Sequence, residues 1–334
     1  MKHAIAVDGG NSKTDVAIVR EDGEVASIAR GGGSSPHHLG LDGALAVIEG
    51  LLERARADAG VQLPAAVAEL LLAGVDFPVE EEAAHRAIEQ RGWAARVSVD
   101  NDTFAVLRAG TDARWGVAVV CGAGMNCVGV APDGRRARFA ALGWTSGDWG
   151  GGADVGREAV SAAARSEDGR GPKSVLERDV PAYFGVSTPS ELAEAMHFGR
   201  IDESRAMELA PVVFAAAADD PVARSIVDHL VDEVVALARV AVTRLGLERA
   251  PVDVVLGGGL LRHADPRLIA AIARGLAPVG PAIAVRATTA PPILGAALLA
   301  LDALAAAPEA YVRVRTSLAA TAAEPVVVGG GEDG

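Results

Sequence analysis

The sequence predicts an α/β protein in which one structural pattern occurs twice. An apolar segment at residues 4–8 runs into a glycine turn, a second apolar segment follows at 16–19, and a third at 25–29 comes after an Asp-Gly turn. Residues 117–141 repeat this order of strand, glycine turn, strand, Asp-Gly turn and strand. A repeat of this kind predicts two similar units that can face each other across a cleft.

The first domain is expected to span residues 1–112. Its three opening strands are antiparallel, and a polar loop is expected at residues 31–40. Beyond that loop, helical spacing alternates with short apolar runs, which indicates one α/β domain. The predicted helices are 43–57, 80–91 and 103–109, and the predicted strands between them are 67–73 and 95–99.

The second domain, residues 113–291, opens with the repeated strands and then contains a helical insertion. Its expected helices are 155–164, 187–196, 206–217, 221–245 and 260–274, with strands at 252–256 and 283–285. A closing helix at 292–306 is expected to pack back on the first domain. Residues 318–334 are small, acidic and glycine-rich, so we expect a flexible tail there.

Composition excludes several classes of partner. The length of 334 residues suits about two domains. A net charge of −13 argues against nucleic acid or an anionic membrane as the partner. The N-terminus runs straight into a strand without a signal-peptide pattern, and no apolar run is long enough for a confident membrane span. The two cysteines, Cys121 and Cys127, form no framework of pairs, so we expect a cytoplasmic protein.

The first glycine turn carries groups that suit the phosphates of a nucleotide. Glycine lets backbone N–H groups approach an anion closely. Asp8, at the strand end, can hold a hard cation through water, and the Lys13 ammonium can reach phosphate oxygens. An ordinary hairpin with a glycine turn would show the same short motif, and the repeat favours the phosphate site. The candidates are Asp8, Gly9, Gly10, Asn11, Ser12, Lys13 and Thr14.

Several motifs, taken in order, resemble a known family. They are residues 7–14 (Val-Asp-Gly-Gly-Asn-Ser-Lys-Thr), 73–76 (Ala-Gly-Val-Asp), Asn101-Asp102, and Gly143-Trp144 followed by Gly147-Asp148. From about Ile5 to about Leu304, the chain resembles the sugar kinase/Hsp70/actin superfamily and, within it, the BadF/BadG/BcrA/BcrD ATPase and N-acetylglucosamine kinase family. The resemblance implies a two-domain actin-like ATPase (ribonuclease H-like) fold with a cleft between the domains. It also implies ATP and Mg²⁺ as cofactors, and a homodimer.

The resemblance assigns roles around the nucleotide and the reacting hydroxyl. The first hairpin would hold the β/γ-phosphates and Asp8 the magnesium. Asp102 would be the general base that accepts a proton from the sugar hydroxyl, which suits a reaction that needs positioning and one acceptor beside the nucleophile. Alternatively, Asp100 or Asp102 caps the helix that follows. In the second domain, phosphate would be held by Gly122, Ala123, Gly124 and Asn126. The adenosine would lie over the turn formed by Gly257, Gly258 and Gly259.

The sugar site implied by the resemblance departs from the family pattern at two positions. The family has an asparagine near the position of Ser35 and a glutamate where Trp149 stands. These departures favour a sugar without the acetyl group, and glucosamine is partly cationic, so neighbouring carboxylates would favour its ammonium form. We therefore expect phosphorylation of the 6-hydroxyl of glucosamine by ATP. The candidate sugar-binding residues are Ser34, Ser35, His37, His38, Asp76, Asp100, Asn101, Gly147 and Asp148.

Three other functions stay open: an N-acetylglucosamine kinase, an ATPase that acts on a protein partner, and a non-catalytic sugar sensor. Relatives of the second kind hold an iron–sulfur cluster between subunits. Cys121 falls where they have a cysteine, but no cysteine follows Cys127, so buried inert thiols are expected. A metal site at His37 and His38 is not expected, since no further ligand is spaced to join them.

Overall fold

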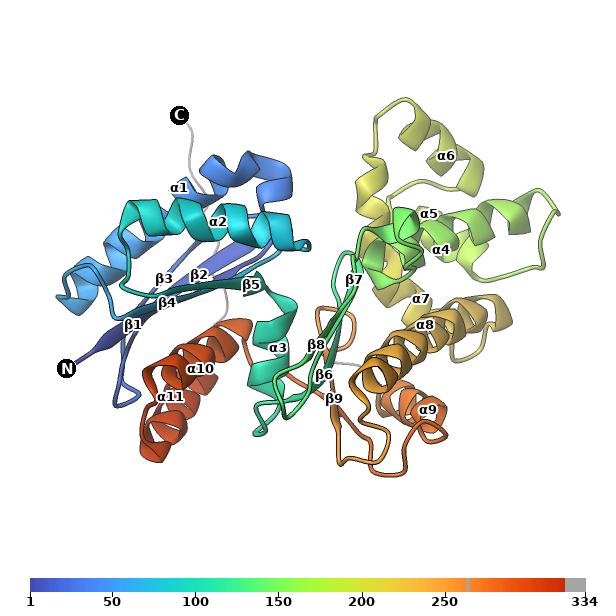
Figure 1. The fold of residues 1–334 in the computed structure, drawn as a ribbon. Helices are drawn as coiled ribbons and strands as arrows, with labels where there is room; N and C mark the ends of the chain where they lie inside the picture. Colours follow the sequence, from blue (N-terminus) through green and yellow to red (C-terminus); the bar gives the residue numbers. More distant parts are fainter. Residues whose placement is uncertain (263–264, 322–334) are drawn as a thin grey trace, which may run out of the picture. The chain divides into compact units, whose positions relative to one another are not determined.

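The computed structural model describes residues 1–262 and 265–321 of the chain. The chain divides into two compact units (Figure 1). The first consists of Met1–Asp112 together with the chain from Ala290 onward, and the second of Ala113–Thr289. Each unit is built on one five-stranded sheet. Within the described residues, no helix combines the length and the apolarity that crossing a membrane would require.

The first sheet has the strand order β3-β2-β1-β4-β5. β2 pairs antiparallel with both β1 and β3, whereas β4 runs parallel to β1 and β5 runs parallel to β4. As a result, β1, β3, β4 and β5 all end at one edge of the sheet. The strands are β1 (His3–Gly9), β2 (Lys13–Arg20), β3 (Val25–Gly32), β4 (Val67–Leu72) and β5 (Val97–Asn101).

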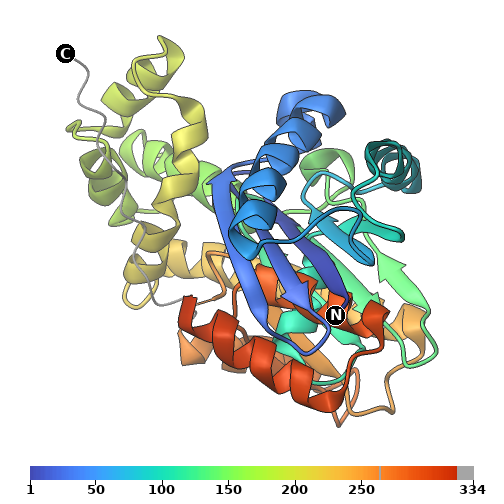
Figure 2. The same cartoon turned by 90° about the vertical axis from the view of Figure 1, so that its left-hand side faces the viewer.

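Helices cover both faces of this sheet (Figures 1 and 2). Ile5 and Val7 on β1 pack in one core with Leu45 and Ile48 of α1. On the opposite face, Gly295 of α10 lies so close to α3 that an added Cβ would come 1.8 Å from the Ala105 carbonyl oxygen. The closing helix therefore belongs to the first unit. The helices are α1 (Pro36–Ala59), α2 (Pro78–Arg91), α3 (Thr103–Gly110), α10 (Pro292–Leu304) and α11 (Pro308–Thr321).

Two predictions for the first unit were wrong in extent. The expected loop at 31–40 is shorter, because β3 continues to Gly32 and α1 begins at Pro36, where the fixed φ of proline suits the first helical turn. Gly40 interrupts α1 with a φ of 67°. This irregular turn breaks the helical spacing of apolar residues, so the sequence pattern did not show that the helix begins before residue 43. The expected tail begins inside α11, which was not predicted and which includes residues 318–321; residues 322–334 lie outside the described residues.

The second sheet, in the order β10-β9-β6-β7-β8, repeats the first. β6 pairs antiparallel with β7 and parallel with β9, as β1 does with β2 and β4. The predicted repeat is therefore a repeat of topology and not of the glycine turn alone. The strands are β6 (Gly116–Cys121), β7 (Met125–Val130), β8 (Arg136–Arg138), β9 (Asp253–Gly257) and β10 (Ala284–Ala287).

Helices pack on this sheet and form the predicted insertion (Figure 1). The predicted helix 206–217 is a 3-10 helix followed by α7, the predicted helix 260–274 begins only at Pro266, and α5 was not predicted. The elements are η1 (Gly143–Thr145), α4 (Gly151–Glu167), α5 (Leu176–Tyr183), α6 (Pro189–His197), η2 (Glu203–Leu209), α7 (Ala210–Ala216), α8 (Pro221–Leu245) and α9 (Pro266–Leu276).

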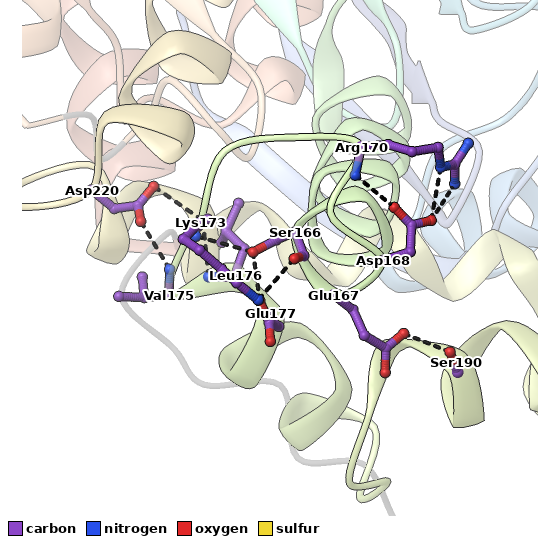
Figure 3. A network of polar contacts seen from close by, with 11 residues as sticks. Ser166, Glu167, Asp168, Arg170, Lys173, Val175, Leu176, Glu177, Ser190 and Asp220 are labelled. Carbon is purple, nitrogen blue, oxygen red and sulfur yellow. Dashed lines mark hydrogen bonds and ion pairs between the residues drawn. The ribbon is translucent and has the colours of Figure 1, made fainter.

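A buried carboxylate ties the insertion together (Figure 3). Asp220 caps α8 by accepting the Ala223 N–H at 2.8 Å, and it also accepts the Val175 N–H at 2.8 Å and the Ser174 hydroxyl at 3.1 Å. Burial by itself would raise the pKa of Asp220, but these hydrogen bonds outweigh it and hold the pKa below the usual value. One side chain thus joins the start of α8 to the start of α5.

Candidate active site

Four loops meet at the carboxyl edge of the first sheet, because four of its strands end there. Backbone hydrogen bonds join three of them. The Ala73 N–H donates to the Gly9 carbonyl at 2.7 Å, and the Ser34 N–H donates to the Gly10 carbonyl at 3.0 Å. The Thr14 hydroxyl also donates to Ser34 Oγ at 2.8 Å. The phosphate turn predicted from the sequence is therefore held directly against the predicted sugar loop.

Charged side chains lie behind the first glycine turn, on one face of the sheet. Asp15 is fully buried and accepts two hydrogen bonds from Arg30, at 2.6 and 3.0 Å, and one from Lys13 at 3.3 Å. Asp8 lies opposite Asp15 in the β1–β2 register and is almost fully buried. Hydrogen bonding to Asp15 raises the pKa of Arg30, and the charges of Asp15 and Asp8 add to this.

This arrangement fits the predicted cation and phosphate roles. A carboxylate at the end of a strand supplies the hard oxygen donors that Mg²⁺ prefers, so Asp8 could hold the ion through water. Asp15 anchors Lys13 beside the turn. Sequence analysis missed Asp15 and Arg30. The available signal was strand alternation, which places Lys13 and Asp15 on the same face of β2.

Asp102 lies between the end of β5 and the start of α3, at the carboxyl edge of the first sheet. It occupies the N-cap position of α3, but its side chain makes no capping hydrogen bond. Asn101 caps instead: its Oδ1 accepts the Thr103 N–H at 2.9 Å, and its Nδ2 donates to Asp76 Oδ1 at 2.8 Å. Burial and, secondarily, the charge of Asp76 raise the pKa of Asp102 to about 6. A half-buried carboxylate with this pKa is ionised at neutral pH and is a stronger base than an ordinary aspartate.

The predicted alignment of Asp100 with Asp102 depended on a strand that continues through residue 102. Strand β5 ends at Asn101, and Asp102 already has helical backbone angles, so the alternation that would align the two carboxylates stops between them. Asp100 is a buried member of the strand.

The structure brings new partners to His37. Its Nε2 lies 3.9 Å from Asp76 Oδ2 and 3.8 Å from Glu80 Oε1. The expectation that no further ligand-type side chain would join this histidine was wrong, because Asp76 and Glu80 are brought to it by the β4–α2 connection. His38 is exposed. The missed signal was Glu80 itself, a glutamate three residues after the N-cap Phe77, as in a capping box.

The second glycine turn abuts the N-terminus of α4. The Gly122 and Ala123 carbonyls accept the N–H groups of Gly152 and Ala153 at 2.8 and 2.9 Å. A Cβ on Gly151 would come 2.4 Å from the Gly124 carbonyl oxygen, so this approach requires glycine. The N–H groups of Gly152 and Ala153 are therefore already paired, so a phosphate here would be held by N–H groups of the turn itself. Asn126, also predicted here, accepts the Cys127 N–H through its Oδ1.

Both cysteines are buried free thiols in the core of the second unit. Burial raises the pKa of Cys121 to about 12, and it raises the pKa of Cys127 as well. Since the thiolate is the form that binds metal and reacts, both side chains act as small apolar groups.

The third glycine turn borders a cavity. Gly258 has φ of 85°, and a Cβ there would come 2.1 Å from the Cys121 carbonyl oxygen. A cavity of about 530 Å³ lies beside this turn, lined by Gly259, Leu260 and Phe214 among others. Its size and largely apolar lining suit a small organic ligand such as a nucleoside.

Gly147 and Asp148 lie in the second unit, apart in the chain from the other predicted sugar residues. Asp148 accepts the Gly143 N–H at 2.7 Å and the Ser146 hydroxyl at 2.5 Å, so its carboxylate shapes its own loop. Trp144 of the same loop is 87% exposed. Trp149, which stands where the family has glutamate, stacks on His229 with ring centroids 3.9 Å apart.

Two sheets of equal strand order, each with a glycine turn between its first two strands, define a two-domain actin-like ATPase fold. The chain belongs to the BadF/BadG/BcrA/BcrD ATPase family, whose profile matches residues 5–300. The family predicted by resemblance is therefore confirmed, and with it the use of ATP. The predicted fold class is also confirmed.

Two sequence relatives and one solved structure are similar to this chain over most of its length. An N-acetylmuramic acid/N-acetylglucosamine kinase from Clostridium acetobutylicum is 27% identical over 79% of this chain and 87% of its own length. An N-acetyl-D-glucosamine kinase from Dictyostelium discoideum is 25% identical over 89% of this chain and 97% of its own. A crystal structure from Chromobacterium violaceum, provisionally named an N-acetylglucosamine kinase, is 27% identical with a TM-score of 0.69, over 90% of this chain and 99% of that one.

Proposed function

We propose that the protein is an ATP-dependent hexosamine kinase that transfers the γ-phosphate of ATP to the 6-hydroxyl of glucosamine. The products are glucosamine 6-phosphate and ADP. The similar proteins carry names of kinases that act on N-acetylated sugars, which supports a sugar acceptor. The observation that carries the proposal is Asp102, a carboxylate released from helix capping, with a pKa raised to about 6, beside a second carboxylate.

In this proposal the first unit performs the chemistry. Asp102 accepts the proton of the sugar 6-hydroxyl while the oxygen of that hydroxyl attacks the γ-phosphorus of ATP. The bond from the γ-phosphorus to the β–γ bridging oxygen breaks at the same time, and ADP leaves. The N–H groups of the turn at residues 9–13 and the Lys13 ammonium hold the transferring phosphoryl group. Asp8 would hold Mg²⁺, which neutralises phosphate charge when bound.

The second unit supplies nucleotide binding in this proposal. The turn at residues 122–124, next to the N-terminus of α4, would hold phosphate. The cavity beside Gly259 and Phe214 would hold the adenosine. Neither role requires a side-chain charge, which fits the buried, protonated thiols at the end of β6 and in β7.

Glucosamine is preferred to its N-acetylated form because of what surrounds Asp102. Asp76, Glu80 and Asp102 are three carboxylates near one another, and opposite charge favours an ammonium group over a neutral amide. Ser35 also stands where the resemblance predicts asparagine.

The experiment that tests the proposal measures ADP release with glucosamine, N-acetylglucosamine, glucose or mannose as the acceptor. Glucosamine should give the highest kcat/KM, and Asp102→Asn should abolish most of the turnover. Equal ADP release without any sugar would overturn the kinase and favour an ATPase that acts on a protein partner. A clear preference for N-acetylglucosamine would overturn the choice of substrate.

N-acetylglucosamine kinase is the second candidate function. The names of the relatives from Clostridium acetobutylicum and Dictyostelium discoideum favour it, at 27% and 25% identity. It would use the same base, phosphate turns and magnesium ligand. The acceptor panel separates the two candidates.

A further inference from the structure

Three hydrogen-bond acceptors surround one small space in the first unit. They are His37 Nε2, a carboxylate oxygen of Asp76 and a carboxylate oxygen of Glu80, all within 4.8 Å of one another. The two histidine–carboxylate distances, 3.9 and 3.8 Å, are too long for direct hydrogen bonds. The three groups therefore face one another across a gap that a further atom could bridge.

The two carboxylates are fixed from behind. Glu80 Oε2 accepts the N–H groups of Asp76 and Phe77 at 2.8 and 2.9 Å, which leaves Oε1 on the His37 side. Asp76 Oδ1 accepts the Asn101 amide at 2.8 Å, which leaves Oδ2 on the His37 side. Each acceptor is thus preorganised by its other oxygen, and a ligand would gain contacts at little ordering cost.

One buried hydroxyl group next to this space, that of Ser35, also has no hydrogen-bond partner among the described residues. Ser35 is 1% exposed. The Ser35 hydroxyl and the His37 ring both lie close to Gly74: a Cβ added to Gly74 would come 3.0 Å from Ser35 Oγ and 3.1 Å from His37 Cγ. Buried hydroxyls are normally hydrogen-bonded, so an unpaired one here indicates a ligand that completes the site.

We infer that His37, Asp76 and Glu80 form a recognition site for a primary ammonium group, the 2-ammonium of the acceptor sugar. A primary ammonium has three N–H donors, and neutral imidazole and two carboxylates offer three acceptors. Charge-assisted N–H···O bonds of about 2.8 Å around a tetrahedral nitrogen place the acceptors about 4.6 Å apart. This value lies within the 4.8 Å that spans the three atoms, and it is longer than the separations of 3.8 and 3.9 Å from His37. An N-acetylated amine has a single N–H and leaves two of these acceptors without a hydrogen-bond donor. This inference rests on the proposed hexosamine kinase.

A divalent metal is the alternative occupant of the same three groups. Ligand bonds of about 2.1 Å in a tetrahedral zinc site bring donor atoms to about 3.4 Å from one another. The observed separations of 3.8 and 3.9 Å are longer than that. These separations lie between the zinc value and the value of about 4.6 Å expected around an ammonium, so the preference for an ammonium rests on its three N–H donors, and metal binding becomes an outcome of the test.

The test uses Glu80→Gln, because glutamine keeps the capping contacts of residue 80 and removes the charge. We expect kcat/KM for glucosamine to fall about tenfold while kcat/KM for glucose changes less than twofold. His37→Gln, at an exposed position, should act in the same direction. Glu82→Gln, exposed on the same helix, is the matched control. An equal fall for both sugars, or no fall, would overturn the assignment.

A binding measurement separates failure of this site from failure of the proposed function. Calorimetry with the Asp102→Asn protein needs no turnover, and it should show weaker glucosamine binding when Glu80→Gln is added, with glucose binding unchanged. If the protein phosphorylates no sugar but still loses glucosamine binding in this way, the kinase proposal fails and the ammonium site stands. Tight binding of ZnCl₂ or MnCl₂ that Glu80→Gln abolishes would overturn the ammonium site in favour of a metal.

Discussion

The two sheets share a strand order but differ in what lies beside their glycine turns. In the first unit, Asp8 faces Asp15 across the hairpin, and Arg30 and Lys13 pair with Asp15. In the second, the corresponding pair across β6 and β7 is Cys121 and Met125, both buried in an apolar core. The same backbone arrangement is thus combined with charge in one unit and with apolar side chains in the other.

This difference indicates a division of labour. A glycine turn offers backbone N–H groups in either unit, so phosphate binding follows from the shared topology. Metal binding and proton transfer need ionisable side chains, and Asp8, Asp102 and the group around His37 all belong to the first unit. The second unit offers a cavity beside Gly259 and an insertion of helices. We expect variants in the first unit to change the chemistry and the sugar preference, and variants in the second to change nucleotide affinity or stability.

The largest expected effect belongs to Asp102→Asn. Removal of the proposed general base should lower kcat by about 10²- to 10⁴-fold, with a small effect on sugar binding, because proton transfer to a correctly positioned side chain contributes about that much. A coupled assay of ADP release measures it. Asp42→Asn, an exposed position in the same unit, is the matched control.

The pH dependence of kcat/KM tests the role of Asp102 independently. The base must be ionised to work, so kcat/KM of the wild-type protein should fall as the pH drops through about 6, the raised pKa of Asp102. An acid limb near pH 4 would mean that Asp102 titrates as an ordinary aspartate, and a loss of less than tenfold in Asp102→Asn would remove it from catalysis.

Lys13→Met should have the next largest effect. In the proposed function the ammonium makes a charge-assisted contact with phosphate, worth about 1.5–3 kcal/mol, so kcat/KM for ATP should fall about 10- to 100-fold. The fold should survive, since Asp15 keeps its two hydrogen bonds from Arg30. Steady-state kinetics with varied ATP measures the change, and Lys2→Met is the control. Unchanged ATP kinetics would mean that Lys13 pairs with Asp15 and does not contact phosphate.

Sequence patterns predicted the strands and their repetition because most of the strands are short apolar runs, several of them followed by glycine. They also placed Asp8, Lys13 and Asp102 at strand ends, where local sequence determines position. They failed where proline and glycine act locally, as at Pro36 and Gly40, since an irregular first turn breaks helical spacing.

The group around His37 shows what sequence patterns could not supply. Glu80 lies 43 positions after His37, on another helix, and the contact depends on β4 and α2 being in place. The role of Asn101 is similar, because its side chain both accepts the Thr103 N–H at the start of α3 and donates to Asp76 on another loop. Contacts between loops at a sheet edge follow from strand order, which spacing along the chain does not encode.

Phe214→Ala tests the second unit and should have a smaller kinetic effect. Loss of one apolar wall of the cavity should raise KM for ATP about fivefold, in line with about 1 kcal/mol of lost contact, and leave KM for the sugar unchanged. Phe198→Ala, an exposed aromatic on the insertion, serves as the control. A larger change in sugar KM than in ATP KM would contradict the division of labour between the units.

Asp220→Ala should leave the kinetics closest to wild type and act on stability. The variant removes the cap of α8 and the acceptor for the Val175 N–H, so the free energy of unfolding should fall by about 1–3 kcal/mol. Urea unfolding followed by circular dichroism measures the difference. Asp219→Ala, the exposed neighbour, should change it little. A fall in kcat/KM as large as that of Lys13→Met would mean that the insertion takes part in the reaction.

The sign of the pH effect on this stability difference follows from the lowered pKa of Asp220. Burial opposes the charged form, but hydrogen bonds from backbone N–H groups and Ser174 more than offset it, so the carboxylate is favoured in the folded state. Its contribution is therefore fully present above the unfolded pKa of about 3.9, and it is lost as the pH falls through the lower folded pKa. The gap between wild type and Asp220→Ala should be full at neutral pH and should shrink below about pH 4. A gap that stays constant down to pH 2 would assign the stabilisation to packing and not to the carboxylate.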